Sequence, residues 1–278
     1  MKKRLYIVTI VLLLIVFGVS AFHVVSYIIG SRQQASKYDE MAAALDAQDA
    51  AVSTAPSTPA QDPTAGNDSE PTVPVMEYVE DPIDEETGVL VRYLDFYKQN
   101  PDLVGWIKIE GTKLNYPVMQ TPHDKDFYLK HNFEREYSDW GAIYAREECD
   151  IFKPSDNITI YGHTMKDGSM FACLHEYTDK AVWETNNVIF FDTIHERHVY
   201  QIFAVFTTTA SLGEGFSYHQ MEDAVDEADF NEFIATCKEL SLYETGITPK
   251  YGEKTICLAT CEYSQDNGRL VVAAVRIY

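Results

Sequence analysis

The segment from residue 255 to residue 277 constrains the fold of this chain more than any other. It contains an apolar run that ends at Cys261, a polar stretch closed by Asn267-Gly268, and a second apolar run that follows Arg269. Asn-Gly between two apolar runs is a strong local signal for a β-hairpin. The segment therefore predicts two paired strands, with a thiol and a guanidinium facing each other across the mouth of the hairpin.

This arrangement suggests nucleophilic chemistry. A thiolate is a strong nucleophile, and a fixed guanidinium can stabilise negative charge that develops on a carbonyl oxygen. An imidazole is still needed, and His163 supplies one at the end of another strand-like run, two residues after Tyr161. We therefore take Cys261, His163 and Arg269 as candidate catalytic residues for acyl transfer.

Each of the five cysteines must also be considered as an ordinary buried residue, since a cysteine is more often a small hydrophobe than a nucleophile. That interpretation suits Cys149, Cys173 and Cys237, and it suits Cys257, which alternates with apolar neighbours inside its strand. Cys261 differs because the apolar run stops there. Cys257 and Cys261 are four residues apart on one strand, about 13 Å, which is too far for a disulfide. We expect no disulfide.

The remaining pattern predicts a mainly β domain over residues 88–278. A short amphipathic helix is expected before Asn100-Pro101, and further helices near residues 168–185 and 221–242. Many short strands with few helices are typical of a β-barrel decorated by helices. The strand-like runs lie near residues 104–109, 113–119, 142–145, 157–162, 187–191, 198–207, 254–261 and 269–277.

Residues 1–30 have the pattern of a membrane anchor. The basic cluster Lys2-Lys3-Arg4 precedes a charge-free stretch from Leu5 to Gly30. As a helix this stretch is about 39 Å long, more than the roughly 30 Å of a bilayer's hydrocarbon core. The basic cluster places the N-terminus in the cytoplasm and the rest of the chain outside, in a single-pass protein of the cell membrane. A cleaved signal peptide is the competing interpretation, because Val19-Ser20-Ala21 offers small residues at the cleavage positions.

Residues 31–87 are expected to form a disordered tether. Six of the eleven prolines lie there, and residues 38–87 contain thirteen Asp or Glu and no Lys or Arg. A segment of this composition buries too little apolar area to offset the entropy lost on ordering.

The motifs around the candidate residues resemble the sortases, cysteine transpeptidases that attach proteins to the cell wall of Gram-positive bacteria. The resemblance rests on Leu258-Ala-Thr-Cys261, the Arg269 that follows a short turn, and Tyr161-Gly-His163 about a hundred residues earlier. The family motif is usually Thr-Leu-x-Thr-Cys, and Cys257 replaces its first Thr. Residues 114–120, 128–129 and 161–171 resemble class B. The resemblance covers about residues 88–278, and it implies a closed barrel of about eight strands with an N-terminal helix and a helix before the cysteine-bearing strand.

The resemblance also implies roles for individual residues. Cys261 would attack the Thr carbonyl of a C-terminal sorting signal in a surface protein and form a thioester. An amino group of a lipid-linked peptidoglycan precursor, or a pilin lysine, would resolve it. His163 would act as acid and base, and Arg269 would stabilise the oxyanion. Tyr161, Thr260 and Glu262 flank these groups and are candidate substrate contacts. No metal and no organic cofactor is expected.

Two other functions use the same residues. The chain could be an exported Cys/His peptidase that acts by hydrolysis, or a non-catalytic, membrane-anchored surface binding module. A papain-like enzyme is disfavoured because its Cys precedes its His, whereas here His163 precedes Cys261. Nucleic acid is not an expected partner, because a net charge of −21 repels phosphate. One departure concerns the substrate: class B sortases often have an Asn shortly before the Tyr128-Leu129 pair, where this chain has Asp124-Lys125-Asp126.

Overall fold

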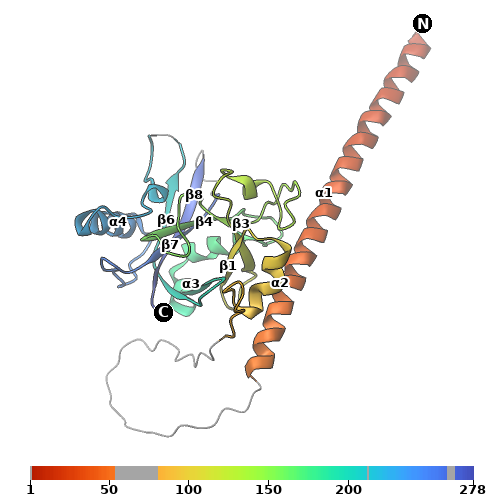
Figure 1. Cartoon of the computed structure of the whole chain (residues 1–278). Coiled ribbons are helices and arrows are strands. Elements are labelled where there is room, and N and C mark those ends of the chain that lie inside the picture. The colour runs from red at the N-terminus through yellow and green to blue at the C-terminus, as the bar shows by residue number, and fades with distance from the viewer. Residues whose placement is uncertain (1, 54–80, 212, 262–266) are drawn as a thin grey trace.

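The computed structural model describes residues 2–53, 81–211, 213–261 and 267–278. In this part of the chain, strands close into a barrel in the order β1-β2-β3-β4-β7-β8-β6-β5 (Figure 1). The predicted eight-stranded closed barrel is confirmed, and the ends of each strand lie within two residues of its predicted run. The strands are β1 (Leu103–Lys108), β2 (Asn115–Met119), β3 (Ile143–Ala145), β4 (Asn157–Tyr161), β5 (Val188–Thr193), β6 (Val199–Thr209), β7 (Thr255–Cys261) and β8 (Gly268–Arg276).

Two strand pairings place the candidate catalytic residues. β4 runs parallel to β7, with Tyr161 opposite Ala259, so both strands end at the same edge of the barrel. β7 and β8 form the predicted antiparallel hairpin, with Cys261 opposite Arg269. The ends of β4 and β7 and the start of β8 therefore meet at one place.

Both faces of the β7–β8 hairpin are buried, which explains its nearly continuous apolar sequence. One face belongs to the main core inside the barrel, with Ile256 and Leu258 fully buried. The other face is covered by the predicted helix before the cysteine strand, α4 (Glu227–Leu240). This helix begins at Asp226, whose carboxylate accepts hydrogen bonds from two backbone N–H groups of the first turn. Its apolar stripe includes Phe230 and packs on the outer face of the hairpin.

The other helices of the barrel domain are short. They are α2 (Val91–Gln99), α3 (Lys180–Thr185) and the 3₁₀ segments η1 (Phe127–Leu129), η2 (Phe171–Thr178) and η3 (Tyr218–Gln220). The expected helix near residues 168–185 is thus a 3₁₀ segment followed by one α-helical piece. The expected helix before Asn100-Pro101 is confirmed as α2.

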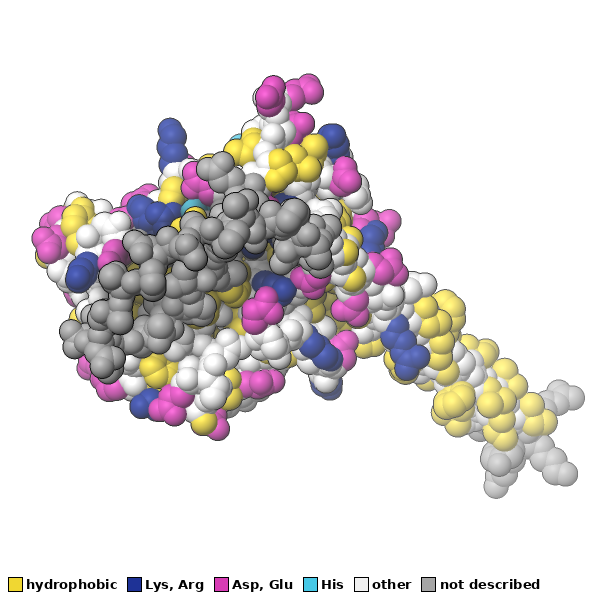
Figure 2. Space-filling view, turned by 90° about the horizontal axis from the view of Figure 1, so that it is seen from below, with side chains coloured by type: hydrophobic (Ala, Val, Ile, Leu, Met, Phe, Trp, Pro, Cys, Tyr) yellow, Lys and Arg dark blue, Asp and Glu magenta, His cyan; other side chains and the backbone are white. Residues whose placement is uncertain are grey.

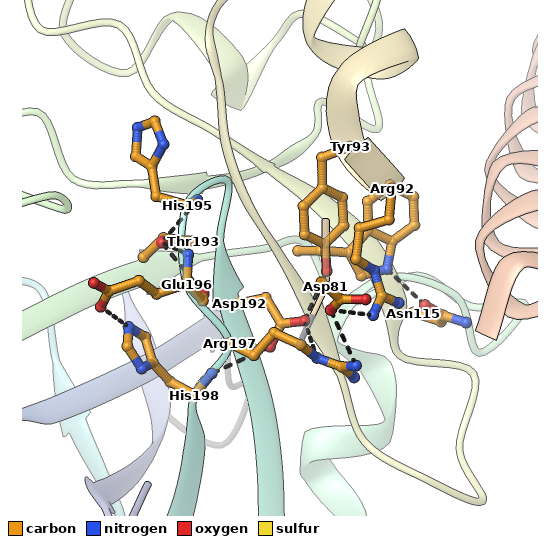
Figure 3. Close-up of polar contacts among 11 residues, drawn as sticks. Asp81, Arg92, Tyr93, Asn115, Asp192, Thr193, His195, Glu196, Arg197 and His198 are labelled. Atoms are coloured by element: carbon orange, nitrogen blue, oxygen red, sulfur yellow. Dashed lines mark hydrogen bonds and ion pairs between the residues drawn. The ribbon is translucent and has the colours of Figure 1, made fainter. Parts of the chain in front are cut away.

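A buried polar network fixes α2 to the β5–β6 hairpin (Figure 3). The Tyr93 hydroxyl donates to the Asp192 carboxylate at 2.7 Å, and Arg197 Nε lies 3.2 Å from the same carboxylate. Arg197 also lies 3.3 Å from Asp81, which pairs with Arg92 of α2 at 3.4 Å. Burial raises the pKa of Asp192, while the neighbouring arginines act in the opposite direction. This network holds the beginning of the domain on the barrel.

The N-terminal region differs from the prediction. A single helix, α1 (Lys2–Ser53), continues through residues 31–53, which the composition predicts to be disordered. Its C-terminal half packs on the barrel because Tyr38, Met41 and Leu45 form a buried stripe at helical spacing. The N-terminal half projects beyond the domain and carries hydrophobic side chains along its length (Figure 2). The stretch 54–80 of the predicted tether lies outside the described residues.

Candidate active site

A pocket of about 310 Å³ lies where β4 and β7 end and β8 begins. Five of the six residues singled out in the sequence line it: Tyr161, His163, Thr260, Cys261 and Arg269. The fold thus brings together residues from β4 and from the β7–β8 hairpin, about a hundred positions apart in the chain. The sixth residue, Glu262, lies outside the described residues, so its expected substrate contact stays a prediction.

The alternation of side chains along β7 separates Cys261 from Cys257. Residues 257, 259 and 261 point to the outer face of the barrel. Cys257 lies beneath α4 with no exposed surface, and burial raises the pKa of its thiol far above the usual range. Cys261, at the end of the strand, is half-buried and lines the pocket. Of these two thiols, only Cys261 can meet a substrate without rearrangement of the core.

Arg269 lies directly across the hairpin from Cys261 and on the same face of the sheet. Opposite residues of an antiparallel pair have Cβ atoms about 5 Å apart, which brings the guanidinium beside the thiol. Arg269 Nη1 donates to the backbone carbonyl oxygens of Asn267 and Gly268, at 3.3 and 2.9 Å. A guanidinium has five N–H donors, and among the described residues its Nε and Nη2 groups make no hydrogen bond, so they can serve a substrate oxygen.

His163 follows the end of β4 and is held by a backbone carbonyl. Its Nε2 lies 2.9 Å from the Leu129 carbonyl oxygen. A carbonyl only accepts hydrogen bonds, so Nε2 carries a proton and proton exchange with a substrate falls to Nδ1. The preceding Gly162 allows the chain to pass close to the core, because a Cβ there would lie 2.6 Å from Ile143 and 2.7 Å from Phe171.

A hydrogen-bond network behind the pocket joins the two strand ends. The Thr260 hydroxyl donates to the Gly162 carbonyl at 2.7 Å and lies 2.8 Å from the Thr164 hydroxyl. His175 Nε2 donates to the Cys261 carbonyl at 3.1 Å and lies 3.1 Å from the same Thr164 hydroxyl. The network fixes the backbone of Cys261 and of the residue before His163. The sequence did not reveal Thr164 and His175, and the Tyr-Gly-His-Thr segment was the only local signal for the first of them.

The candidate substrate contacts differ in their surroundings. Thr260 is 2% exposed and its hydroxyl is engaged in the network, which favours a positioning role over contact with a peptide. Tyr161 is half-buried and lines the pocket, and burial raises the pKa of its phenol far above the usual range. Its hydroxyl therefore stays protonated and can donate to a substrate.

The pocket has more cations than the acidic composition of the chain would suggest. Lys125, Arg146 and Arg269 face Asp126 and Glu147 among its lining residues, in a chain of net charge −21. Lys125 pairs with Glu147 at 3.4 Å, and Arg146 pairs with Glu148 and Glu222 at 2.9 and 2.8 Å. Arg269, in contrast, contacts backbone carbonyl oxygens, so its charge is the one best placed to meet negative charge on a substrate. Lys125 and Asp126, which belong to the segment where class B sortases often have an Asn, thus line the pocket. Over the described residues, no group of three or more His, Cys, Asp or Glu is placed to hold a metal ion.

A closed eight-stranded barrel with a thiol, an imidazole and a guanidinium at one strand edge has the architecture of a cysteine transpeptidase. The family model described as "Sortase domain" matches residues 107–277 of the chain. That match covers more than half of the sequence, and the chain belongs to the sortase family.

Within this family the chain is a class B member. Sortase B of Staphylococcus aureus is 33% identical over 181 residues, which are 64% of this chain and 71% of that protein. Two solved structures share the fold at 24% identity. A Staphylococcus aureus sortase B–substrate complex has a TM-score of 0.70 and covers 90% of this chain and 98% of its own. A sortase B complexed with triglycine has a TM-score of 0.68 and covers 89% and 98%.

Proposed function

We propose that this transpeptidase cleaves a C-terminal sorting signal after Thr and transfers the surface protein to an amino group of a cell-wall precursor. The cross-strand pair of Cys261 and Arg269, in a pocket that also contains His163, is the observation that carries the proposal. Membership of the sortase family supports transpeptidation as the type of reaction. The cross-strand pair supports Cys261 as the nucleophile and Arg269 as the group that stabilises the oxyanion.

The reaction proceeds in two displacements at one carbonyl carbon. The Cys261 thiolate forms a bond to the Thr carbonyl carbon, and Arg269 stabilises the negative charge on the oxygen. The C–N bond then breaks, and His163 gives a proton to the leaving amine. An incoming amine attacks the thioester, His163 accepts its proton, and the thiolate of Cys261 leaves. Atoms and protons balance without a cofactor.

The acceptor is proposed to be a primary amine of the cell wall, with a pilin lysine as the other candidate. The complexes of similar proteins with a substrate and with triglycine support a peptide donor and a glycine amine acceptor. The pocket lies where β4 and β7 end, with the half-buried Cys261 in its lining, so donor and acceptor can reach the same thioester in turn.

The chain is proposed to be anchored in the cell membrane with its catalytic domain outside. α1 is long and apolar enough to cross a membrane, with a mean hydropathy of 2.4 in its apolar window and no part of that window buried. Lys2-Lys3-Arg4 at its start favours a cytoplasmic N-terminus.

A panel of fluorescent pentapeptides tests this function, with each peptide incubated with the enzyme in the presence and absence of triglycine. Transpeptidation predicts a ligated product that ends in triglycine and dominates when the amine is present. Hydrolysis products alone, at all triglycine concentrations, would favour the peptidase alternative. No cleavage of any peptide and no reaction of Cys261 with a thiol probe would favour a binding module.

A further inference from the structure

One loop of the catalytic domain is bound to the anchor helix α1. We call residues 130–141 the interface loop. The Trp140 ring packs against the Tyr27 ring with centroids 4.8 Å apart. A Cβ at Gly30 would lie 3.5 Å from two carbons of the same indole. The Trp140 ring therefore packs directly on the surface of the helix at Gly30. Gln34 of α1 donates to the Gly141 carbonyl at 2.7 Å.

Further contacts continue down the helix. The Ser138 hydroxyl bonds to the Gln34 side-chain oxygen, and Lys37 forms an ion pair with Glu134. Tyr38 then packs edge-on against Tyr116 of β2 at 5.4 Å. These contacts therefore fix the position of the interface loop along the axis of α1, beside residues 27–37.

If α1 spans a bilayer, residues 27–37 and the interface loop beside them lie at the outer surface of that bilayer. About twenty helical residues cross the roughly 30 Å hydrocarbon core, so a span that begins at Leu5 ends near Val24. Tyr27 lies about 4 Å beyond that point, and Arg32 is the first charged residue after the apolar stretch. Trp and Tyr are favoured at this level because their rings are apolar at one end and polar at the other.

The exposed side chains of this region suit a headgroup layer. Tyr137 is 71% exposed and Tyr27 is 51% exposed, so their hydroxyls can reach the headgroups, while Trp140 is half-buried, with its indole N–H covered by protein and part of its ring exposed. The local charge is close to neutral in a chain of net charge −21, which limits repulsion by anionic lipids. Four cations of this region, Arg32, Lys37, Lys130 and Arg135, offset Glu134, Glu136 and Asp139.

The interface loop also adjoins the catalytic machinery. It begins directly after Leu129, whose carbonyl accepts from His163. It ends at Gly141, where a Cβ would lie 2.6 Å from that same carbonyl oxygen. β8 starts at the end of the barrel toward which the free half of α1 points, and the C-terminus lies at the opposite end (Figure 1).

We propose that the interface loop, with Trp140 at its centre, docks into the headgroup layer of the bilayer that α1 spans. Docking holds the active-site pocket facing the membrane surface, where an amine acceptor carried on a lipid arrives. The inference rests on the proposed membrane anchoring, and it adds that the catalytic domain itself contacts the lipid.

Tryptophan fluorescence of the full chain in vesicles tests this contact. The vesicles contain phosphatidylcholine and phosphatidylglycerol, with or without bromine atoms on the acyl chains next to the headgroup. The chain has three tryptophans. Trp106 is buried in the barrel, and Trp183 of α3 donates its indole N–H to the Ile202 carbonyl. Helix α3 lies near the C-terminus, away from the free half of α1 (Figure 1). Wild-type protein is compared with Trp140→Phe and with the matched control Trp183→Phe.

The proposal predicts that bromolipid lowers the emission of the wild type and of Trp183→Phe by the same absolute amount, and that Trp140→Phe loses most of this decrease. Unchanged quenching in Trp140→Phe, or no quenching of the wild type, would overturn it. Flotation of the vesicles separates the two proposals. A chain that floats with the vesicles but shows no Trp140 quenching refutes docking alone, whereas a chain that does not float refutes the anchoring and the docking together.

Discussion

At the scale of single residues, the position along β7 decides which cysteine a substrate can reach. Cys257 and Cys261 share one face of the strand, but only the first is covered by α4. Burial raises the pKa of Cys257, so its thiol stays protonated at neutral pH. Cys261 lies past the end of the helix and faces the pocket and Arg269.

Substitution of each cysteine tests this difference. Cys261→Ala should abolish peptide cleavage and labelling by a thiol-reactive probe while the circular dichroism spectrum persists. Cys257→Ala should retain substantial cleavage, with a loss of stability of about 1 kcal/mol or more because a small cavity opens in the core. If the two variants exchanged their behaviour, the nucleophile would be Cys257.

Arg269→Lys tests the planar fork of donors. The ammonium of lysine keeps the charge but cannot donate to the hairpin backbone and to a substrate oxygen in the same geometry. We expect kcat/KM to fall by at least about tenfold, equivalent to about 1.4 kcal/mol of transition-state stabilisation. A rate near that of the wild type would reduce Arg269 to a structural residue of the turn.

His175 is expected to act as a positioning residue through the Cys261 carbonyl. His175→Ala removes this donor, and we expect kcat to fall by about tenfold with little change in KM, since the Cys261 carbonyl keeps only the longer bond from the Thr164 hydroxyl, at 3.4 Å, among the described residues. His175→Gln keeps an N–H near the same place and should recover part of kcat. A matched loss of stability without any change in kcat would show that His175 only supports the fold.

At the scale of elements, the β5–β6 hairpin introduces a pH dependence. His198 is buried at its turn, and burial, together with the nearby Arg276, lowers the pKa of its imidazole below the usual value of 6.5. The unfolded chain therefore takes up a proton at a pH where the folded chain does not. The contribution of His198 to the free energy of unfolding is therefore fully present above the pKa that this histidine has in the unfolded chain. It declines as pH falls below about 6.5.

His198→Gln should weaken that dependence. The free energy of unfolding, measured by urea titration at pH 5 and pH 7, should fall less on acidification in the variant than in the wild type. His195→Gln is the matched control, since its ring is only half-buried on the same hairpin. Equal pH dependence in the wild type and His198→Gln would contradict the assignment.

Most elements could be predicted because their signal is local. Each of the eight strands is a short apolar or alternating run, and the two apolar runs that end at Cys261 and begin after Arg269 predict that these residues face each other, as the register shows. The network of Thr164, Thr260 and His175 could not be predicted, since all but one of its bonds join residues 86 to 98 positions apart. Thr164 and Thr260 lie in recognisable motifs, but nothing in those motifs shows that their side chains meet.

The helical continuation of α1 was missed for a different reason. Averaged over residues 31–87, the composition is that of a disordered chain. Within it, however, Tyr38, Met41 and Leu45 have the spacing of one helix face, among alanines with high helix propensity. Composition averaged over a shorter stretch of sequence would have detected this apolar stripe. It would not have shown the surface of the barrel on which the stripe packs.

At the scale of the whole molecule, the helix is more than a spacer. Its C-terminal half buries three apolar side chains on the barrel, and Gln34 holds the loop whose neighbour supports His163. α1, the interface loop and His163 therefore form one connected unit.

Two truncated chains test this connection. Residues 31–278 should have a melting temperature higher by about 3 °C or more than residues 81–278, which corresponds to about 1 kcal/mol. The longer chain should also cleave peptides faster, because the carbonyl of Leu129 is better fixed. Gln34→Ala in the longer chain should lose part of the rate while it keeps most of the stability. Equal rates and melting temperatures in both chains would restore the description of this segment as a tether.

The central claim is that Cys261 carries the substrate as a thioester. The most direct measurement is mass spectrometry of the protein after incubation with a cleaved sorting peptide in the absence of amine, followed by digestion. The account predicts a mass increase equal to the N-terminal part of the peptide, located on the fragment that contains Cys261 and removed by hydroxylamine or triglycine. An acyl group on another cysteine, or peptide turnover by Cys261→Ala, would contradict it.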